Sequence, residues 1–138
     1  TSNTGLTLLQ GSERLFLKSL LAGAHGCISA LASIAPEWHR QILDAVHGGD
    51  VAAGEEAQER IDSLIALFQL PDVGQSLAHF VHTLKRAARM RGWIDETHSV
   101  LPGFEPAADF DRAISDIVNR SELPVGSPSV LKPASRSA

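Results

Sequence analysis

The sequence predicts an α/β fold built on parallel strands, and three observations support this prediction. Two short apolar runs, residues 6–10 and 27–31, each precede a stretch with helical spacing. The two runs start about twenty residues apart, which is typical of strand–helix units repeated in parallel. From residue 50 onward the apolar spacing stays helical. Because two parallel strands cannot form a sheet covered on both faces, we interpret the chain as the end of a larger barrel followed by helices.

The first unit begins with the apolar run Leu6 to Gln10, which suits a buried parallel strand. Gly11 then allows a sharp turn, and Ser12 is a candidate N-cap for the next helix. Gly23 is placed to end that helix as a C′ residue. The residues predicted on its apolar face are Leu15, Phe16, Leu20 and Leu21.

The second unit repeats this order of signals. Cys27 to Leu31 is an almost wholly apolar strand, and Pro36 is placed for the first position of a helix. Gly48 and Gly49 are expected to end that helix. A buried strand followed by an amphipathic helix is the repeating unit of both barrels and doubly wound sheets, so two units do not decide between them. The apolar face of this helix is predicted at Trp38, Ile42, Ala45 and Val46.

The remainder of the chain is predicted to be helical. Asp50 is a candidate N-cap, the segment 70–74 breaks the helix that follows, and Gly92 closes the next one. We therefore divide the chain into residues 1–49 with two strand–helix units, 50–121 with three helices, and 122–138 as a disordered tail rich in small residues and proline. The basic residues Lys85, Arg86, Arg89 and Arg91 are predicted on a solvated or subunit-facing surface.

Composition excludes several classes of protein. A net charge of −4, a pI near 5.8 and the lack of a basic cluster argue against nucleic-acid binding. No apolar run is long and uninterrupted enough to predict a membrane span. The single cysteine excludes an internal disulfide framework and suits a reducing compartment, so we expect a cytoplasmic protein. Because the chain begins with Thr1, we expect a processed product, a fragment or an incomplete gene model.

Three patterns along the first 68 residues resemble a known family. Leu9-Gln10-Gly11 matches the end of its seventh barrel strand, Gly26-Cys27-Ile28-Ser29 its eighth strand, and Ser33-Ile34-Ala35-Pro36 the continuation. The spacing between the patterns fits without gaps, and Gln58-Glu59-Arg60 matches a later helix. In these features the chain resembles the dihydrodipicolinate synthase / N-acetylneuraminate lyase family of Schiff-base enzymes. The resemblance covers the C-terminal portion of the family only.

The resemblance implies a fold and a chemistry. The fold would be the C-terminal part of a (β/α)8 TIM barrel, its last two strand–helix units, plus a three-helix C-terminal extension. The parent protein would be a class I pyruvate-dependent aldolase or lyase, such as a dihydrodipicolinate synthase or a 4-hydroxy-2-oxoglutarate aldolase-like enzyme, acting on pyruvate or another 2-keto acid without a cofactor. Family members are homo-oligomers, and a tetramer would be expected. About 170 further residues would complete the barrel.

The catalytic residues of the family are not expected in this chain. Family members use a barrel-strand lysine as nucleophile and a tyrosine as proton relay, and the sequence contains no tyrosine. Lys18 and Lys85 lie among charged residues on predicted helices and Lys132 lies in the tail, so none is placed as a desolvated nucleophile. We therefore expect this chain alone to be inactive. The alternative is a truncated, non-catalytic helical interaction module.

Two positions are predicted to contribute to substrate binding. Gly11 and Ile28 match family positions whose backbone lies near the bound keto acid, at the carboxyl ends of the strands. The competing interpretations are that Gly11 only forms a turn and that Ile28 only fills the barrel. His79 and His82 have a spacing compatible with two metal ligands, but no third ligand accompanies them, so no metal site is predicted.

Overall fold

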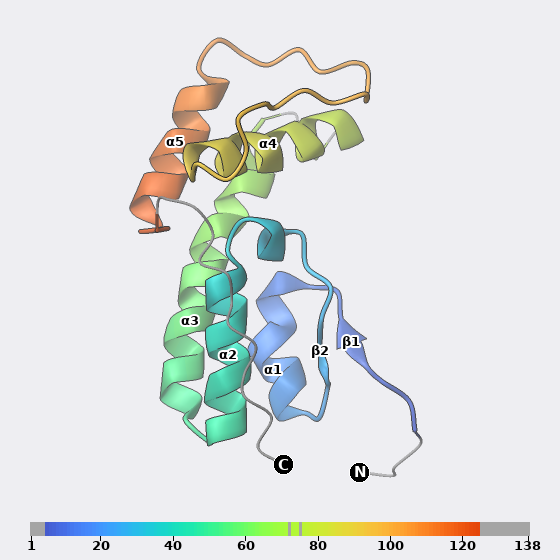
Figure 1. The fold of residues 1–138 in the computed structure, drawn as a ribbon, viewed down its shortest axis with the longest axis vertical. Coiled ribbons are helices and arrows are strands. Elements are labelled where there is room, and N and C mark those ends of the chain that lie inside the picture. Colours follow the sequence, from blue (N-terminus) through green and yellow to red (C-terminus); the bar gives the residue numbers. More distant parts are fainter. Residues whose placement is uncertain (1–4, 72, 75, 125–138) are drawn as a thin grey trace.

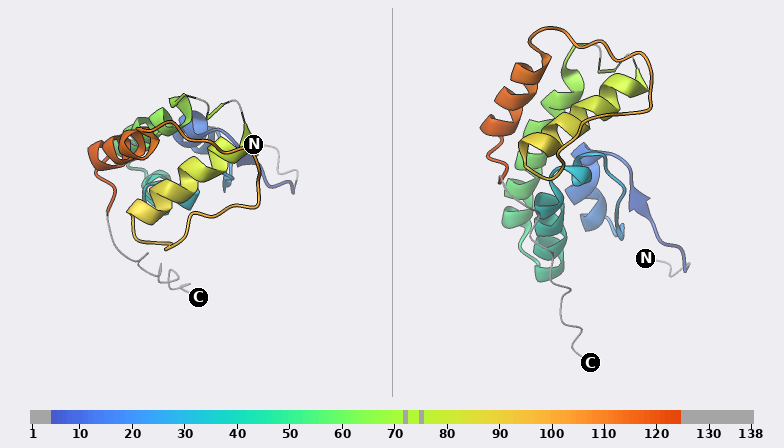
Figure 2. Two further views of the ribbon diagram at one scale, coloured as in Figure 1. Left: turned by 90° about the horizontal axis from the view of Figure 1, so that it is seen from above. Right: turned by 45° about the horizontal axis from the view of Figure 1, so that its top comes forward.

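The computed structural model describes residues 5–71, 73–74 and 76–124. Two short parallel strands lie on one side of the helix α1. Helices α2 and α3 lie beside α1, and α4 and α5 lie at the far end of α3 (Figures 1 and 2). The result is an α/β fold that is mostly helical. In chain order the elements are β1 Leu9–Gln10, η1 Glu13–Leu15, α1 Phe16–Leu21, β2 Gly26–Cys27, η2 Leu31–Ser33, α2 Pro36–Gly48, α3 Val51–Leu64, η3 Ile65–Gln69, α4 Leu77–Met90 and α5 Phe110–Arg120.

The two strands pair in parallel, with Leu9 opposite Gly26 and Gln10 opposite Cys27. Both are shorter than predicted, and the predicted strand 27–31 gives way to the 3-10 turn η2. Leu6 and Leu8 are 77% and 64% exposed, although the sequence predicted buried strand residues. Within the described chain each strand has one neighbouring strand. Each strand is therefore only as long as the stretch over which that neighbour pairs with it.

The first helix ends as predicted but begins differently. Gly23 has a φ of 99°, a left-handed conformation that glycine adopts without strain. Ser12 makes no side-chain cap. Instead, Oε1 of Gln10 accepts hydrogen bonds from the backbone N–H groups of Gly11 at 2.8 Å and Ser12 at 2.9 Å. The buried residues of α1 are Phe16, Leu17 and Leu20, whereas Leu15 in η1 and Leu21 at the end of α1 are about half exposed.

The hairpin of α2 and α3 follows the predicted signals. Pro36 occupies the first turn of α2, and Gly49 ends it with a φ of 76°. The carboxylate of Asp50 caps α3 by accepting the N–H of Ala53 at 3.1 Å. Gly54 lets α3 approach α1 closely, because a Cβ there would lie 2.9 Å from Cδ1 of Leu17. The helix caps predicted for this part of the chain are therefore confirmed.

One hydrophobic core joins the strand-bearing segment to the helical region. Fully buried residues come from α1, η2, α2, α3, η3, α4 and α5, so no boundary separates two cores at residue 50. Helix α4 contacts η2, which follows the carboxyl end of β2. Most of the predicted tail, residues 125–138, lies outside the described residues. The largest aliphatic and aromatic side chains that are fully buried in the core are Phe16, Leu31, Ile34, Ile42, Ile61, Leu64, Leu67 and Ile114.

Arg91 corrects the prediction of a solvated basic surface. Its side chain is 1% exposed and forms two hydrogen bonds with the carboxylate of Glu37, at 2.8 and 3.1 Å. It also donates to the carbonyl oxygens of Ile34 and Pro124, and its guanidinium stacks 3.9 Å above the ring of Trp93. Arg91 therefore holds together the start of α2, the end of α4 and the segment after α5.

The ion pair also sets the titration of Glu37. Partial burial by itself would raise the pKa of Glu37, but the hydrogen bonds from Arg91 and from its own backbone, with the charge of Arg91, hold the pKa below its usual value. A carboxylate of this kind stabilises the fold above its unfolded-state pKa. That contribution is lost as the pH falls through the lowered folded-state pKa.

Replacing Arg91 by Met should lower the free energy of unfolding by about 3 kcal/mol, because it leaves a partly buried carboxylate and two carbonyl groups without their donor. Urea unfolding followed by circular dichroism measures this loss. Arg89→Met is the matched control, since Arg89 is exposed on the same helix and should change stability by less than about 0.5 kcal/mol. Equal effects of the two substitutions would contradict the role assigned to Arg91.

Candidate functional site

The candidate site lies at the carboxyl ends of β1 and β2, where parallel strands of α/β folds place their ligands. The backbone N–H of Ile28 donates to the carbonyl oxygen of Gln10 at 2.9 Å, which sets Gly11 beside Ile28. The structure thus brings together the two residues predicted to bind substrate. They come from different strands and adjoin because the strands run in the same direction.

Ile28 and Gly11 both present open surface. Ile28 is 73% exposed, so in the described chain it is not a core residue. Gly11 has no positive φ, and nothing lies within 4 Å of the position of an added Cβ. The space in front of Ile28 and Gly11 is therefore not filled by other residues of the described chain. Whether they contact a substrate stays a prediction.

Glu13 connects the two strand ends. Its Oε1 accepts hydrogen bonds from Oγ of Ser29 at 3.1 Å and from the backbone N–H of Ala30 at 3.1 Å, with a longer one from Leu31 at 3.5 Å. Glu13 belongs to η1, after β1, and the three donors follow β2. One carboxylate therefore fixes the turn after β1 to the turn after β2.

His39, on α2, forms a hydrogen bond with the Ser29 side chain. Its Nε2 lies 3.0 Å from Oγ of Ser29, and its Nδ1 lies 2.8 Å from the carbonyl oxygen of Ala35. The ring is 5% exposed and packs 5.6 Å from the ring of Phe16. Burial is the main cause that lowers the pKa of His39, opposed by the hydrogen bond to Ala35 and the charge of Glu13.

Sequence reasoning did not assign Glu13 or His39 to the site. Glu13 lies in the turn η1, and its side chain reaches across to the segment that follows the second strand. His39 does carry a usable signal, because it shares the apolar face of α2 with Ile42. A polar residue on an apolar helix face requires a buried hydrogen-bond partner.

The other candidate groups lie elsewhere. Lys18 is exposed on α1, Lys85 donates to the carbonyl oxygen of His98, and Lys132 is outside the described residues. His79 bonds to Ser76, and the ring of His82 stacks 3.9 Å from the ring of Phe104. Among residues 5–71, 73–74 and 76–124, no group of three metal-ligating side chains occurs. The same residues contain no helix long and apolar enough to span a membrane.

Cys27 lies beside this site but is poorly suited to react. The thiol is partly exposed on β2. Burial raises the pKa of Cys27, and the negative charge of Glu13 raises it further. Since the thiolate is the reactive form of cysteine, both effects oppose nucleophilic chemistry. Cys27 is therefore better interpreted as a small apolar residue than as a nucleophile.

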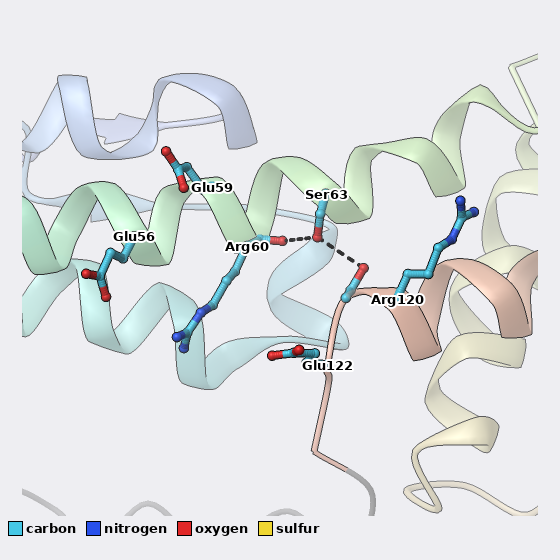
Figure 3. Close-up of a pocket in the computed structure, with 7 residues that line it drawn as sticks. Glu56, Glu59, Arg60, Ser63, Arg120 and Glu122 are labelled. Carbon is cyan, nitrogen blue, oxygen red and sulfur yellow. Dashed lines mark hydrogen bonds between the residues drawn. The ribbon is translucent and has the colours of Figure 1, made fainter.

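A hollow on the described surface lies away from the strand ends. It measures about 350 Å³ and lies between α3 and the end of α5 (Figure 3). Oγ of Ser63 bonds to Oγ of Ser121 at 3.0 Å and to the carbonyl oxygen of Arg60, so its central hydroxyl groups are already paired. Three carboxylates and two guanidinium groups line it, a mixture that favours no ligand charge. The lining residues are Glu56, Glu59, Arg60, Ser63, Arg120, Ser121 and Glu122.

The fold is that of an α/β protein with parallel strand–helix units, and its polar network lies at the carboxyl ends of the strands. Comparison with known proteins makes this specific. The model of the dihydrodipicolinate synthetase family matches residues 1–120, and the chain belongs to that family. A crystal structure of YagE, a prophage protein of the dihydrodipicolinic acid synthase family from E. coli K12 in complex with pyruvate, superposes with a TM-score of 0.72 at 24% identity. The match covers 85% of this chain and 37% of YagE.

Curated relatives are similar over part of their length. The 4-hydroxy-tetrahydrodipicolinate synthase of Nitrobacter hamburgensis is 36% identical over 83 residues, which cover 59% of this chain and 27% of that enzyme. The synthase of Bifidobacterium animalis subsp. lactis is 29% identical over 120 residues, covering 87% of this chain and 38% of that enzyme. The chain therefore spans between about a quarter and two fifths of these two relatives.

Replacing Glu13 by Ala should lower the free energy of unfolding by about 1–3 kcal/mol, because the N–H of Ala30 loses its acceptor in a half-buried site. Glu13→Gln retains an amide oxygen in that position and should lose less. Thermal or urea unfolding measures both. The control is Arg14→Ala on the exposed neighbour. The assigned role fails if Glu13→Ala is as mild as the control.

Proposed function

We propose that this chain is the C-terminal part of a pyruvate-dependent class I aldolase or lyase, providing the last two strand–helix units of a (β/α)8 barrel and a three-helix extension. One observation carries the proposal. The strand pair of a chain that belongs to the dihydrodipicolinate synthetase family has open edges and bare apolar side chains, as expected if further strands complete it. The bare residues on the strands and beside them are Leu6, Leu8, Leu9 and Ile28.

In the proposed enzyme, the chain forms the wall of the pocket. Class I chemistry begins when a lysine amine attacks the keto carbon of pyruvate; loss of water then leaves a protonated imine that accepts electrons from the adjacent carbon. Ile28 would cover the small apolar methyl group, and the open Gly11 would let the substrate approach the backbone. Pyruvate is the ligand named for YagE, which supports a 2-keto acid as the substrate class.

The nucleophile and the proton relay would come from the part of the barrel before residue 1. No lysine of the described residues lies at the strand ends, and the chain has no tyrosine. The reaction needs no metal or cofactor, since the imine itself withdraws the electrons. We further propose a cytoplasmic homo-oligomer, with the helical region as the natural place for subunit contacts.

The second candidate function is a truncated, non-catalytic helical interaction module. The same exposed leucines support it, because bare apolar surface favours association with another chain. The two functions differ in what covers the strand edges: further strands of one barrel, or an unrelated partner. The coding sequence before Thr1 distinguishes them, as a lysine-bearing strand there supports the enzyme and an unrelated domain supports the module.

Borohydride reduction in the presence of pyruvate tests the proposed chemistry. Two proteins are produced: the chain alone, and the chain joined to the segment encoded upstream of it. Covalently bound pyruvate is measured in both by mass spectrometry of the peptides. We expect an adduct on a lysine of the upstream segment and none on the chain alone. An adduct on Lys18 or Lys85, or no adduct in the joined protein, would contradict the proposal.

A matched pair of variants tests the pocket wall in the same assay. Ile28→Ala should reduce trapping several-fold at limiting pyruvate, because a buried methyl contact is lost from the pocket. Val51→Ala removes similar volume from an exposed residue at the start of α3 and should leave trapping unchanged. Equal trapping in both variants would show that Ile28 does not line the pocket, while the proposed imine chemistry would still hold.

A further inference from the structure

Three polar atoms form a row beside the strand ends. Oε1 of Glu13 lies 3.1 Å from Oγ of Ser29, which in turn lies 3.0 Å from Nε2 of His39. Both distances are those of hydrogen bonds, and each bond requires one hydrogen. The atoms come from η1, from the segment after β2, and from α2, so the row crosses three elements.

The tautomer of His39 follows from its other nitrogen. Nδ1 lies 2.8 Å from the carbonyl oxygen of Ala35, and a carbonyl oxygen can only accept a hydrogen bond. Nδ1 therefore carries a hydrogen. In a neutral imidazole Nε2 is then a bare acceptor, and in the charged form it carries a second hydrogen.

The row lacks one hydrogen when Glu13 is ionised and His39 is neutral. The two bonds need two hydrogens, and the Ser29 hydroxyl supplies one. In that state Ser29 donates to Glu13 or to His39, and two lone pairs face each other across the remaining gap. One added proton on His39 satisfies both bonds, because Nε2–H then donates to Ser29 and Ser29 donates to Glu13.

We propose that Glu13, Ser29 and His39 form a proton-sharing row that takes up one proton. Uptake of this proton fixes the backbone segment that comes directly after Ile28. The same Oε1 of Glu13 accepts the N–H of Ala30, and Oγ of Ser29 accepts the N–H of Ala32 at 3.3 Å. Movement of either side chain therefore loosens the backbone next to Ile28. Glu13 and His39 are positioning residues in this proposal, which is independent of the proposed function.

The surroundings set the pH range. Burial keeps the pKa of His39 below its ordinary value of 6.5, and its place in the first turn of α2 also disfavours a cation. The proton is thus taken up below pH 6.5. Because the unfolded chain protonates this histidine at higher pH than the folded one, the free energy of unfolding falls as the pH drops past 6.5, although the row itself becomes fully bonded.

Few other charged groups face the row among the described residues. Cys27 contributes a thiol from β2 whose raised pKa keeps it neutral, α1 contributes the ring of Phe16, and the amide of Gln58 from α3 donates to the carbonyl oxygen of Glu13 at 2.9 Å. Glu37 precedes His39 on α2 but is paired with Arg91. Glu13 is therefore the charged group that acts on the pKa of His39, which it raises against the larger effect of burial.

Nuclear magnetic resonance tests the proposal on this chain. The ring nitrogens of His39 and the backbone amide of Ala30 are followed from pH 7.5 to 5. We expect both to titrate with one common midpoint below pH 6.5. In Ser29→Ala the Ala30 amide should stop following His39, and in Glu13→Gln the His39 midpoint should fall by about one pH unit.

Asp44→Asn is the control, because Asp44 is an exposed carboxylate on α2 that pairs with Arg40 and should leave the midpoint unchanged. Glu13→Gln retains an acceptor oxygen, so it reports even if Ser29→Ala fails to fold. The proposal is overturned if the Ala30 amide stays constant while His39 titrates, or if Glu13→Gln shifts the midpoint no more than Asp44→Asn does.

Discussion

The pair of Glu37 and Arg91 is the interaction on which the arrangement of the chain depends. Arg91 is 1% exposed and its partner begins α2, so the pair joins the strand-bearing segment to the helical region across 54 residues of sequence. A buried guanidinium requires compensation at every donor, and carbonyl oxygens of Ile34 and Pro124 complete it. Without the pair, the hydrophobic core would still favour contact between α4 and η2, but the hydrogen bonds from Arg91 to the start of α2 would be lost.

A second polar tie orders the strand ends. The carboxylate of Glu13 holds the backbone after β2, while Gln10 closes the turn after β1. Two strands of two residues each could not hold their ends in place by ladder hydrogen bonds alone. The polar side chains around them therefore position Gly11 and Ile28, the two residues from which the proposed pocket wall is built. His39 links this tie to α2.

Local signals in the sequence predicted local structure well. Pro36, Gly49, Asp50 and Gly92 start and end helices through their own backbone preferences, which need no distant partner. The neighbouring positions of Gly11 and Ile28 result from the parallel pairing of β1 and β2. Strand length was predicted poorly because it depends on a neighbouring strand. The partners of Arg91 and Glu13 could not be predicted because they lie 54 and 16 residues away, and their pairing is settled by packing.

We propose that further strands of one barrel cover the open edges of β1 and β2. Amide hydrogen exchange in residues 6–10 and 26–29 tests it most directly, with the chain measured alone and joined to the segment encoded upstream. We expect fast exchange at the outer edges in the chain alone and strong protection in the joined protein, while exchange in α2 and α3 changes little. Equal exchange of the strand amides in the two samples would contradict it.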